Sequence, residues 1–228
     1  MCLPKSSIGK KALMSATGLV LFGFVIMHML GNLQIFLGAE ALNNYAEMLQ
    51  GIPEALWLVR AILLACLMFH MWTAAVLTVE NRRARPIPYQ VKNTVKATFA
   101  SKTMMISGLT ILFFIVYHLL HYTFGVLEPE YFHLADVKGR HDVYTMVVSS
   151  FRHRSVSLTY VTAMAFLALH LDHGAAVWLQ SLGLATEKMR PFLDKFGRVS
   201  AIVVFVGNSS IPLAVMSGLL RLPVKGVA

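Results

Sequence analysis

The chain has 228 residues, of which 57% are hydrophobic and 14% are charged, and its mean hydropathy is +0.64. A soluble core of this size does not need so much apolar sequence, so a water-soluble globular protein is excluded and an integral membrane protein is expected. The net charge of +9 fits loops that face anionic lipid or an acidic soluble partner, and nucleic-acid binding is not expected.

Five apolar runs are long enough to cross a bilayer, since a spanning helix needs about 20 residues. They cover residues 12–36, 55–79, 103–124, 156–179 and 199–220. The first run follows Lys5, Lys10 and Lys11, as a signal peptide would, but it is longer than a signal segment and carries a histidine, so we expect it to be retained. The sequence therefore predicts an all-α fold, in which residues 1–228 form a single domain, a bundle of five transmembrane helices.

Turn residues mark the expected ends of these helices. Gly51-Ile52-Pro53 precedes the second run, Arg85-Pro86-Ile87-Pro88 interrupts the next loop, and Gly183 follows the fourth run where a helix C-cap is expected. In the fifth run, Asn208-Ser209-Ser210-Ile211-Pro212 predicts an interruption and a kink, because proline frees a backbone carbonyl. Cys2 lies in the amino-terminal tail, too far from the second run to form a disulfide there.

Lys and Arg are distributed unequally over the two alternating sets of loops. The amino terminus and loops 80–102 and 181–198 hold three, six and four of them, whereas loops 34–54 and 126–155 and the carboxyl-terminal tail hold none, four and two. Cytoplasmic loops carry the excess of Lys and Arg. We therefore expect the amino terminus in the cytoplasm and the carboxyl terminus outside.

Four histidines, one in each of the first four runs, lie at depths that match in pairs. His28 and His118 lie sixteen and fifteen residues into runs that start in the cytoplasm, and His70 and His170 lie fourteen to fifteen residues from the outer ends of the two opposite runs. At ~1.5 Å per helical residue the two levels are roughly 10 Å apart. Imidazole is costly in a membrane, and pairs of imidazoles from facing helices hold haem iron. The pattern predicts two stacked b haems, with His28 and His118 on the outer iron and His70 and His170 on the inner iron.

His121 and His173 are the alternative ligands, since each lies three residues beyond a chosen histidine on a neighbouring part of the same helix face. Either choice shifts the depth match by about a turn. We expect them to be hydrogen-bond partners or polar lining of the cofactor site, with His173 at the haem edge. The remaining histidines, His133, His141 and His153, are expected to be solvated in the outer loop.

Haem propionates are anionic and need hydroxyl, arginine or imidazole partners. Ser15 and Ser107, near the cytoplasmic ends of their runs, and Arg60, near the outer end of the second run, are candidates for these contacts. Helix-end hydrogen bonding for the serines and snorkelling for the arginine are the alternatives. Glu47 and Glu54 could exchange protons with a quinone, although a solvated loop carboxylate is the simpler interpretation.

The chain resembles the five-helix, di-haem cytochrome b subunit of succinate:quinone oxidoreductases and quinol:fumarate reductases over nearly its whole length. The motifs that carry the resemblance are HMLGNLQIFLGAEALNNYAEML from His28, WLVRAILLACLMFH ending at His70, SGLTILFFIVYHLLHYTFG around His118, DVYTMVVSSF from Asp142 and LHLDHGAAVWLQSLGL around His170. By position, the family's axial ligands fall on the four histidines already chosen.

The resemblance implies a membrane anchor in the bacterial cytoplasmic (inner) membrane that binds a flavoprotein subunit and an iron-sulfur subunit. It would pass electrons through two b haems between the iron-sulfur subunit and a membrane quinone, expected to be menaquinone, and would not oxidise succinate alone. Some members carry an acidic residue two positions before the fourth ligand, where this chain has Ala168. Two alternatives remain: the di-haem anchor of another respiratory oxidoreductase, and a haem-free transporter that uses these histidines for proton transfer.

Overall fold

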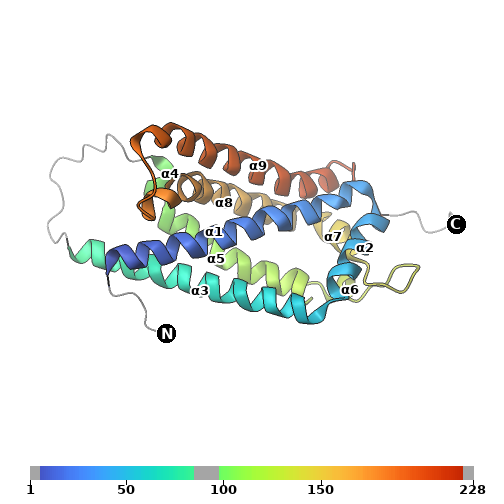
Figure 1. Ribbon diagram of the computed structural model, residues 1–228. Helices are drawn as coiled ribbons and strands as arrows, with labels where there is room; N and C mark the ends of the chain where they lie inside the picture. Colours follow the sequence, from blue (N-terminus) through green and yellow to red (C-terminus); the bar gives the residue numbers. More distant parts are fainter. Residues whose placement is uncertain (1–5, 85–97, 223–228) are drawn as a thin grey trace.

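The computed structural model describes residues 6–84 and 98–222, which form a helical bundle (Figure 1). In chain order the helices are α1 (Ser7–Asn32), η1 (Leu33–Leu37), α2 (Ala39–Gln50), α3 (Pro53–Arg83), α4 (Phe99–Lys102), α5 (Met104–His118), η2 (Leu119–Thr123), α6 (Pro129–Phe132), α7 (Val143–Phe151), α8 (Arg154–Ser181), η3 (Glu187–Met189) and α9 (Arg190–Met216). Within these residues, five helical segments are long and apolar enough to cross a membrane: Ser7–Leu37, Pro53–Arg83, Met104–Thr123, Arg154–Ser181 and Glu187–Met216. The expected all-α fold and its five spans are confirmed, which indicates a multi-pass membrane protein.

Two predicted boundaries are wrong at the fifth span. α9 begins at Arg190, so residues 190–198, expected in a loop, form its first turns, and it ends at Met216 rather than at residue 220. The polar stretch does not end the helix, since α9 continues through Pro212, and the kink expected there stays a prediction. Polar side chains bond to carbonyls nearby: the amide of Asn208 donates to Val204 at 2.9 Å and the hydroxyl of Ser210 to Gly207 at 2.7 Å.

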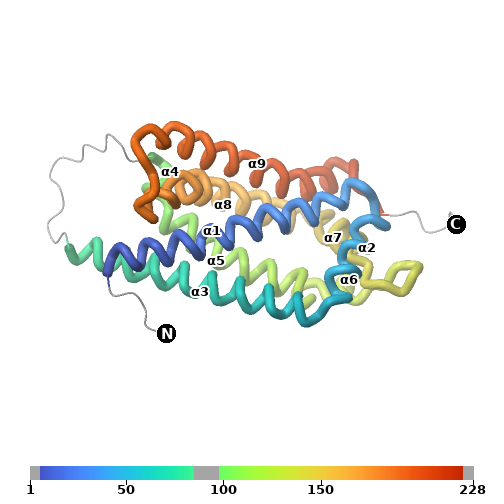
Figure 2. Tube along the Cα trace, in the orientation of Figure 1, coloured from blue at the N-terminus to red at the C-terminus, as the bar shows by residue number. Residues whose placement is uncertain are grey.

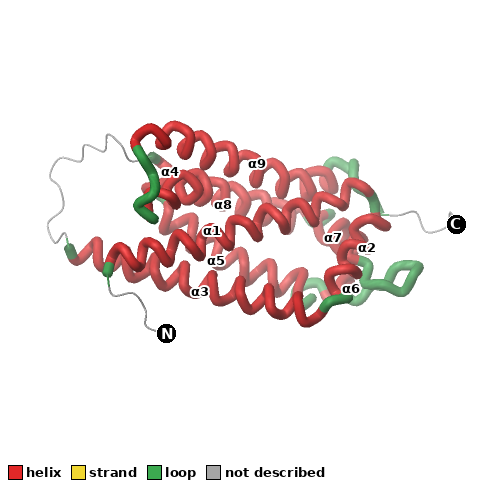
Figure 3. The backbone as a smooth tube through the Cα atoms, viewed as in Figure 1, coloured by secondary structure: helices red, strands yellow, loops and turns green. Residues whose placement is uncertain are grey.

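The long helices run side by side, and the loops gather at the two ends of the bundle (Figures 2 and 3). We call the end that holds Ser6, Arg83 and the α8–α9 connection the amino end. The opposite end, which we call the cap end, holds α2, α6, α7 and the end of α9. The alternation of loops expected from the sequence is therefore present. The predicted turn at residues 85–88 and Cys2 lie outside the described residues.

Two of the spanning helices, α3 and α5, pack on other helices but hardly on each other. α1 packs on α3, α8 packs on α5 and α9, and α1 also contacts α8 and α9, whereas α3 and α5 make few or no contacts with one another. The α8–α9 contact is close because α9 has Gly197 there, where a Cβ would lie 2.5 Å from the carbonyl oxygen of Asp172. The bundle thus consists of an α1–α3 pair and an α5–α8 pair, with α9 across α1 and α8.

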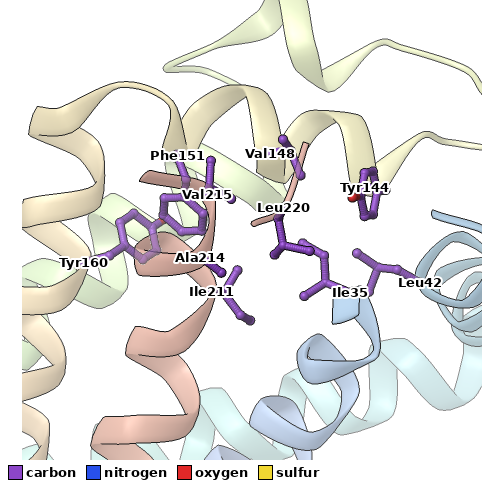
Figure 4. Packing of buried hydrophobic residues seen from close by; sticks show 10 residues of the cluster. All are labelled: Ile35, Leu42, Tyr144, Val148, Phe151, Tyr160, Ile211, Ala214, Val215 and Leu220. Atoms are coloured by element: carbon purple, nitrogen blue, oxygen red, sulfur yellow. The ribbon is translucent and has the colours of Figure 1, made fainter. Parts of the chain in front are cut away.

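The principal apolar core lies at the cap end, where α7, α8, α9 and the segment that follows α1 meet (Figure 4). Burial of these side chains ties the connections to the ends of the spans. The cluster consists of Ile35, Leu42, Tyr144, Val148, Phe151, Tyr160, Ile211, Ala214, Val215 and Leu220.

A polar network joins α2 to the loop before α7. Asn43, only 2% exposed, donates to Asp136 and Asp142 and accepts from the backbone N–H of Tyr144. Arg140 pairs with Asp136 at 2.6 Å. The two outer loops of the sequence are therefore folded into a cap of short helices over the bundle.

Two predicted turns are confirmed. Pro53 stands at the first turn of α3. Gly183, with φ +74°, follows α8, and the N–H groups of Gly183 and Leu184 donate to the carbonyls of Gln180 and Leu179. This pattern satisfies carbonyls that the end of a helix leaves free, and glycine adopts the left-handed conformation it requires.

Candidate cofactor site formed by two histidine pairs

The four span histidines meet in two pairs, and each pair joins the two halves of the bundle. His28 of α1 and His118 of α5 have ring centroids 5.7 Å apart. His70 of α3 and His170 of α8 have ring centroids 6.3 Å apart. We call the first the cap-side pair and the second the amino-side pair. The structure brings together the same partners that the depth count matched.

The spacing of both pairs suits two imidazoles bound to one metal ion from opposite sides. Metal–imidazole nitrogen bonds are about 2 Å long, so such rings have centroids roughly 6 Å apart. The described part of the chain contains no group of three or more His, Cys, Asp or Glu side chains that could hold a metal ion. Each pair therefore offers two ligands, as an iron needs when a porphyrin supplies the other four.

Hydrogen bonds orient both rings of the amino-side pair. Nδ1 of His70 lies 3.1 Å from the carbonyl oxygen of Met14, which can only accept a hydrogen bond. Nδ1 of His170 lies 3.3 Å from the hydroxyl oxygen of Ser107, which itself donates to the carbonyl of Met104. Both Nδ1 atoms must therefore donate, and each Nε2 keeps a free lone pair, the form in which a neutral imidazole binds a metal.

Glycines allow the neighbouring helices to lie close to this pair. A Cβ at Gly18 of α1 would lie 3.1 Å from Cε1 of His70, and one at Gly108 of α5 would lie 3.4 Å from Cε1 of His170. By contrast, a Cβ at Gly23 or Gly174 would meet nothing within 4 Å. The close approach of a neighbouring helix is therefore a feature of Gly18 and Gly108, which lie beside the two imidazoles of the amino-side pair.

Aromatic side chains surround the cap-side pair. Phe24 stacks on His28 with centroids 5.3 Å apart, and Phe114 stacks on His118 at 5.8 Å. The ring of Tyr160 lies edge-on to His118 at 5.9 Å. Such a lining excludes water and limits the rotation of both imidazoles.

Beyond His118, a chain of hydrogen bonds leads to a carboxylate near the cap surface. The hydroxyl of Tyr160 lies 3.3 Å from Nδ1 of His118 and 3.1 Å from Nδ1 of His121. Nε2 of His121 lies 2.9 Å from Glu128, which also accepts a hydrogen bond from the hydroxyl of Ser150. The side chain of His121 is 1% exposed and that of Glu128 is 17% exposed. Both nitrogens of His121 are thus engaged, so the geometry favours His118 as the residue with a free nitrogen.

The backbone at His121 has an unusual form that creates this contact. Residues Leu119–Thr123 form a π-helical turn, in which the N–H of Phe124 donates to the carbonyl of Leu119, five residues earlier. Gly125, with φ +63°, then reverses the chain, and a Cβ there would overlap Phe132. The reversal brings Glu128 back against His121. Single π-helical turns are frequently found at functional sites.

The other predicted site residues lie in different surroundings. Ser107 is fully buried against His170, and Ser15 is buried on α1 beside Met14. His173 is half-buried on α8, one turn beyond His170. Arg60 is exposed on α3, where its guanidinium lies 5.0 Å from the ring centroid of Trp57. The serines and His173 therefore lie near the amino-side pair, whereas Arg60 lies on the outer face of its helix.

The outer-loop residues expected to be solvated are exposed, with one exception. Glu47 and Glu54 are exposed, as expected, and Glu47 lies 3.7 Å from Arg140. His133 and His153 are exposed. The expectation for His141 is wrong, since the cap folds over it: it is half-buried against Phe132, and its Nε2 is buried without a partner in the described residues.

Ionised groups hold the cap together. Hydrogen bonds from Lys138 and Arg140 lower the pKa of Glu40 to about 2. For Asp136, partial burial acts to raise the pKa, but hydrogen bonds from Arg140 and Lys138 outweigh it and hold the pKa at about 2. The same pairs raise the pKa of Arg140. The cap thus contains two carboxylates that stay ionised at pH values well below the usual pKa range of such groups.

Sequence reasoning missed Tyr160, Glu128 and Ser150, because nothing in their spacing links them to His121 before the chain folds. The one available signal was the pair of histidines three residues apart at 118 and 121. Comparison with protein-family models, with curated proteins and with solved structures finds no match for this chain.

Proposed function

We propose that the chain is the membrane-anchor cytochrome b subunit of a succinate:quinone oxidoreductase or quinol:fumarate reductase. In this role it passes electrons between an iron-sulfur subunit and a membrane quinone, expected to be menaquinone, through two b haems. The observation that carries the proposal is the pair of facing histidine couples, His28 with His118 and His70 with His170, each at a spacing that suits one iron.

The residues divide the work of holding the cofactors. His28 and His118 would bind the outer iron, and His70 and His170 the inner iron. Met14 and Ser107 keep Nδ1 protonated on His70 and His170, so Nε2 of each imidazole would be free to bind the iron. When bound, the haems supply one-electron carriers at two depths of the membrane. The weak contact between α3 and α5 supports this arrangement, since a cofactor would take the place of direct helix packing there.

The basic amino end is the proposed docking face for the flavoprotein and iron-sulfur subunits. Exposed cations there include Lys11, Arg82, Arg83, Lys188 and Arg198. This end is nearer to the amino-side pair, so an iron-sulfur cluster bound there would be closest to the inner haem. By the distribution of Lys and Arg, the amino end faces the bacterial cytoplasm.

Ala168 stands where some related anchors carry an acid, and it packs against the apolar cluster of Leu171, Ala201 and Val204. We therefore propose no carboxylate relay at this position. The quinone is placed at the cap end, near the outer ends of α1, α3 and α5, because a second haem in the outer half is needed only if the quinone reacts there.

A pyridine haemochrome assay on the complex purified from membranes tests the proposal. Four ligands in two pairs predict two b haems for each copy of this chain. One haem or none would refute it. The absence of haem would favour the transporter, whereas two haems with partners other than a dicarboxylate-binding flavoprotein would favour the anchor of another respiratory oxidoreductase.

A further inference from the structure

With an ionised Glu128 and a neutral His121, the hydrogen-bond chain from His118 to Glu128 has only one consistent set of donors. A carboxylate can only accept, so Nε2 of His121 must donate to Glu128. Neutral His121 then has a lone pair on Nδ1, which accepts the hydroxyl proton of Tyr160. Because the hydroxyl has a single proton, its oxygen must accept from Nδ1 of His118. The last atom of this chain, Nε2 of His118, keeps its lone pair.

We propose that Glu128 is a positioning residue for the outer haem ligand: through His121 and Tyr160 it holds His118 in the tautomer that presents Nε2 to the iron. The inference rests on the proposed function, because it concerns the role of His118 as a ligand. It assigns a role to a carboxylate that lies ten residues beyond the ligand and touches neither His118 nor its partner His28.

Three further observations support this role. Ser150 of α7 also donates to Glu128, so the carboxylate is fixed from a second helix. The π-helical turn and the chain reversal at Gly125 lie between His121 and Glu128 or next to them, and together they bring Glu128 against His121. On the amino-side pair, Met14 and Ser107 fix the same tautomer directly, so the two pairs reach one result by different routes.

The reverse tautomer shows why an acceptor at Glu128 matters. Without it, the proton of His121 is free to move to Nδ1 and donate to Tyr160, whose hydroxyl then points its proton at Nδ1 of His118. An imidazole that binds iron through Nε2 carries a proton on Nδ1 and cannot accept a hydrogen bond there. His118 would therefore lose its hydrogen bond to Tyr160. Hydrogen-bond donation from Nδ1–H makes the ligand more basic and stabilises oxidised iron. Its loss should therefore favour the reduced form.

The experiment is a redox titration of the whole complex, followed by visible and electron paramagnetic resonance spectra, with the inner haem as internal reference. Glu128→Leu and Tyr160→Phe should each shift the outer haem toward the reduced state by about tenfold, or ~59 mV for one electron, with the inner haem unchanged. Glu128→Gln should shift it less, since its amide oxygen still accepts from His121. Glu130→Leu, on the exposed side of α6, is the matched control and should change nothing.

An outer haem in Tyr160→Phe with the same potential and spectrum as in Glu130→Leu would overturn the inference. So would a Glu128→Gln shift larger than that of Tyr160→Phe, because it would assign the effect to charge alone. If Glu128→Leu does not assemble, the other two variants still decide. A wild-type complex without haem would instead refute the proposed function.

Discussion

Nδ1 of His70 on α3 lies 3.1 Å from the carbonyl oxygen of Met14 on α1. The partner of this imidazole is backbone, so no side-chain substitution removes it, and its position depends on how closely α1 and α3 approach. Gly18, one turn after Met14, sets that approach because its missing Cβ leaves room for the imidazole of His70.

Gly18→Leu should therefore remove the amino-side haem and leave the cap-side haem in place. A Cβ at this position would already lie 3.1 Å from Cε1 of His70, so the longer side chain of leucine overpacks the site, and overpacking of this kind costs about 1–3 kcal/mol. The measurement is the haem content of the purified complex, which should fall by about half. Ala16→Leu, on the exposed side of the same helix, is the control. Equal haem loss in both variants would show that close approach at Gly18 is not the cause.

His118→Ala should lose the cap-side haem, whereas His121→Ala should keep both haems. The reason is that both nitrogens of His121 are already bonded, to Tyr160 and to Glu128. Haem content and the visible spectrum of each purified variant decide between them. If the His121 variant loses a haem and the His118 variant retains both, the assignment of the ligand is wrong.

The sequence predicted the spans and the pairing of the histidines because both follow from helix geometry. Apolar length defines a span, and the constant rise per residue converts the position of His28 or His170 into a depth. The sequence could not predict what lies around those rings. The contact of His121 with Glu128 depends on a π-helical turn and a reversal at Gly125, and the burial of His141 depends on the fold of the cap. Such features arise from tertiary packing rather than from spacing.

The cap should loosen in acid between about pH 4 and about pH 2. The folded pKa values of Glu40 and Asp136 are both about 2, below the ~4 of an unfolded chain, so in this window the unfolded state binds more protons and stability falls as the pH falls. Proteolysis of residues 126–142 in detergent solution measures the opening. Arg140→Gln should make the cap less stable near neutral pH and its stability less dependent on pH. A cap equally resistant at both ends of the window would contradict the prediction.

The amino end should face the cytoplasm and be covered by the soluble subunits. Single cysteines introduced by Lys188→Cys at the amino end and Val137→Cys at the cap end, in a background that carries Cys2→Ser and Cys66→Ala, report this with an impermeant maleimide. Val137 is fully exposed, and Lys188 is exposed. We expect the Val137 site to react in right-side-out vesicles. The Lys188 site should react only in inverted vesicles, and only after the soluble subunits are stripped. Reaction of the Lys188 site in right-side-out vesicles would reverse the topology.

Turnover should respond to the membrane potential, because the proposed quinone site and the soluble subunits lie at opposite ends of the bundle. During quinol-driven fumarate reduction, electrons would move from the cap end to the amino end, toward the negative side of an energised membrane. Each electron then works against ~2.3 kcal/mol per 100 mV. The apolar packing of Ala168 offers no carboxylate at that position to carry a compensating proton.

An inside-negative potential should therefore slow the reaction in liposomes, and an uncoupler should restore the rate. The rate should be measured with the potential set by potassium and valinomycin in both directions. A rate that is the same at every potential, together with quinone bound beside the His70–His170 pair, would place the quinone at the amino end and refute this arrangement.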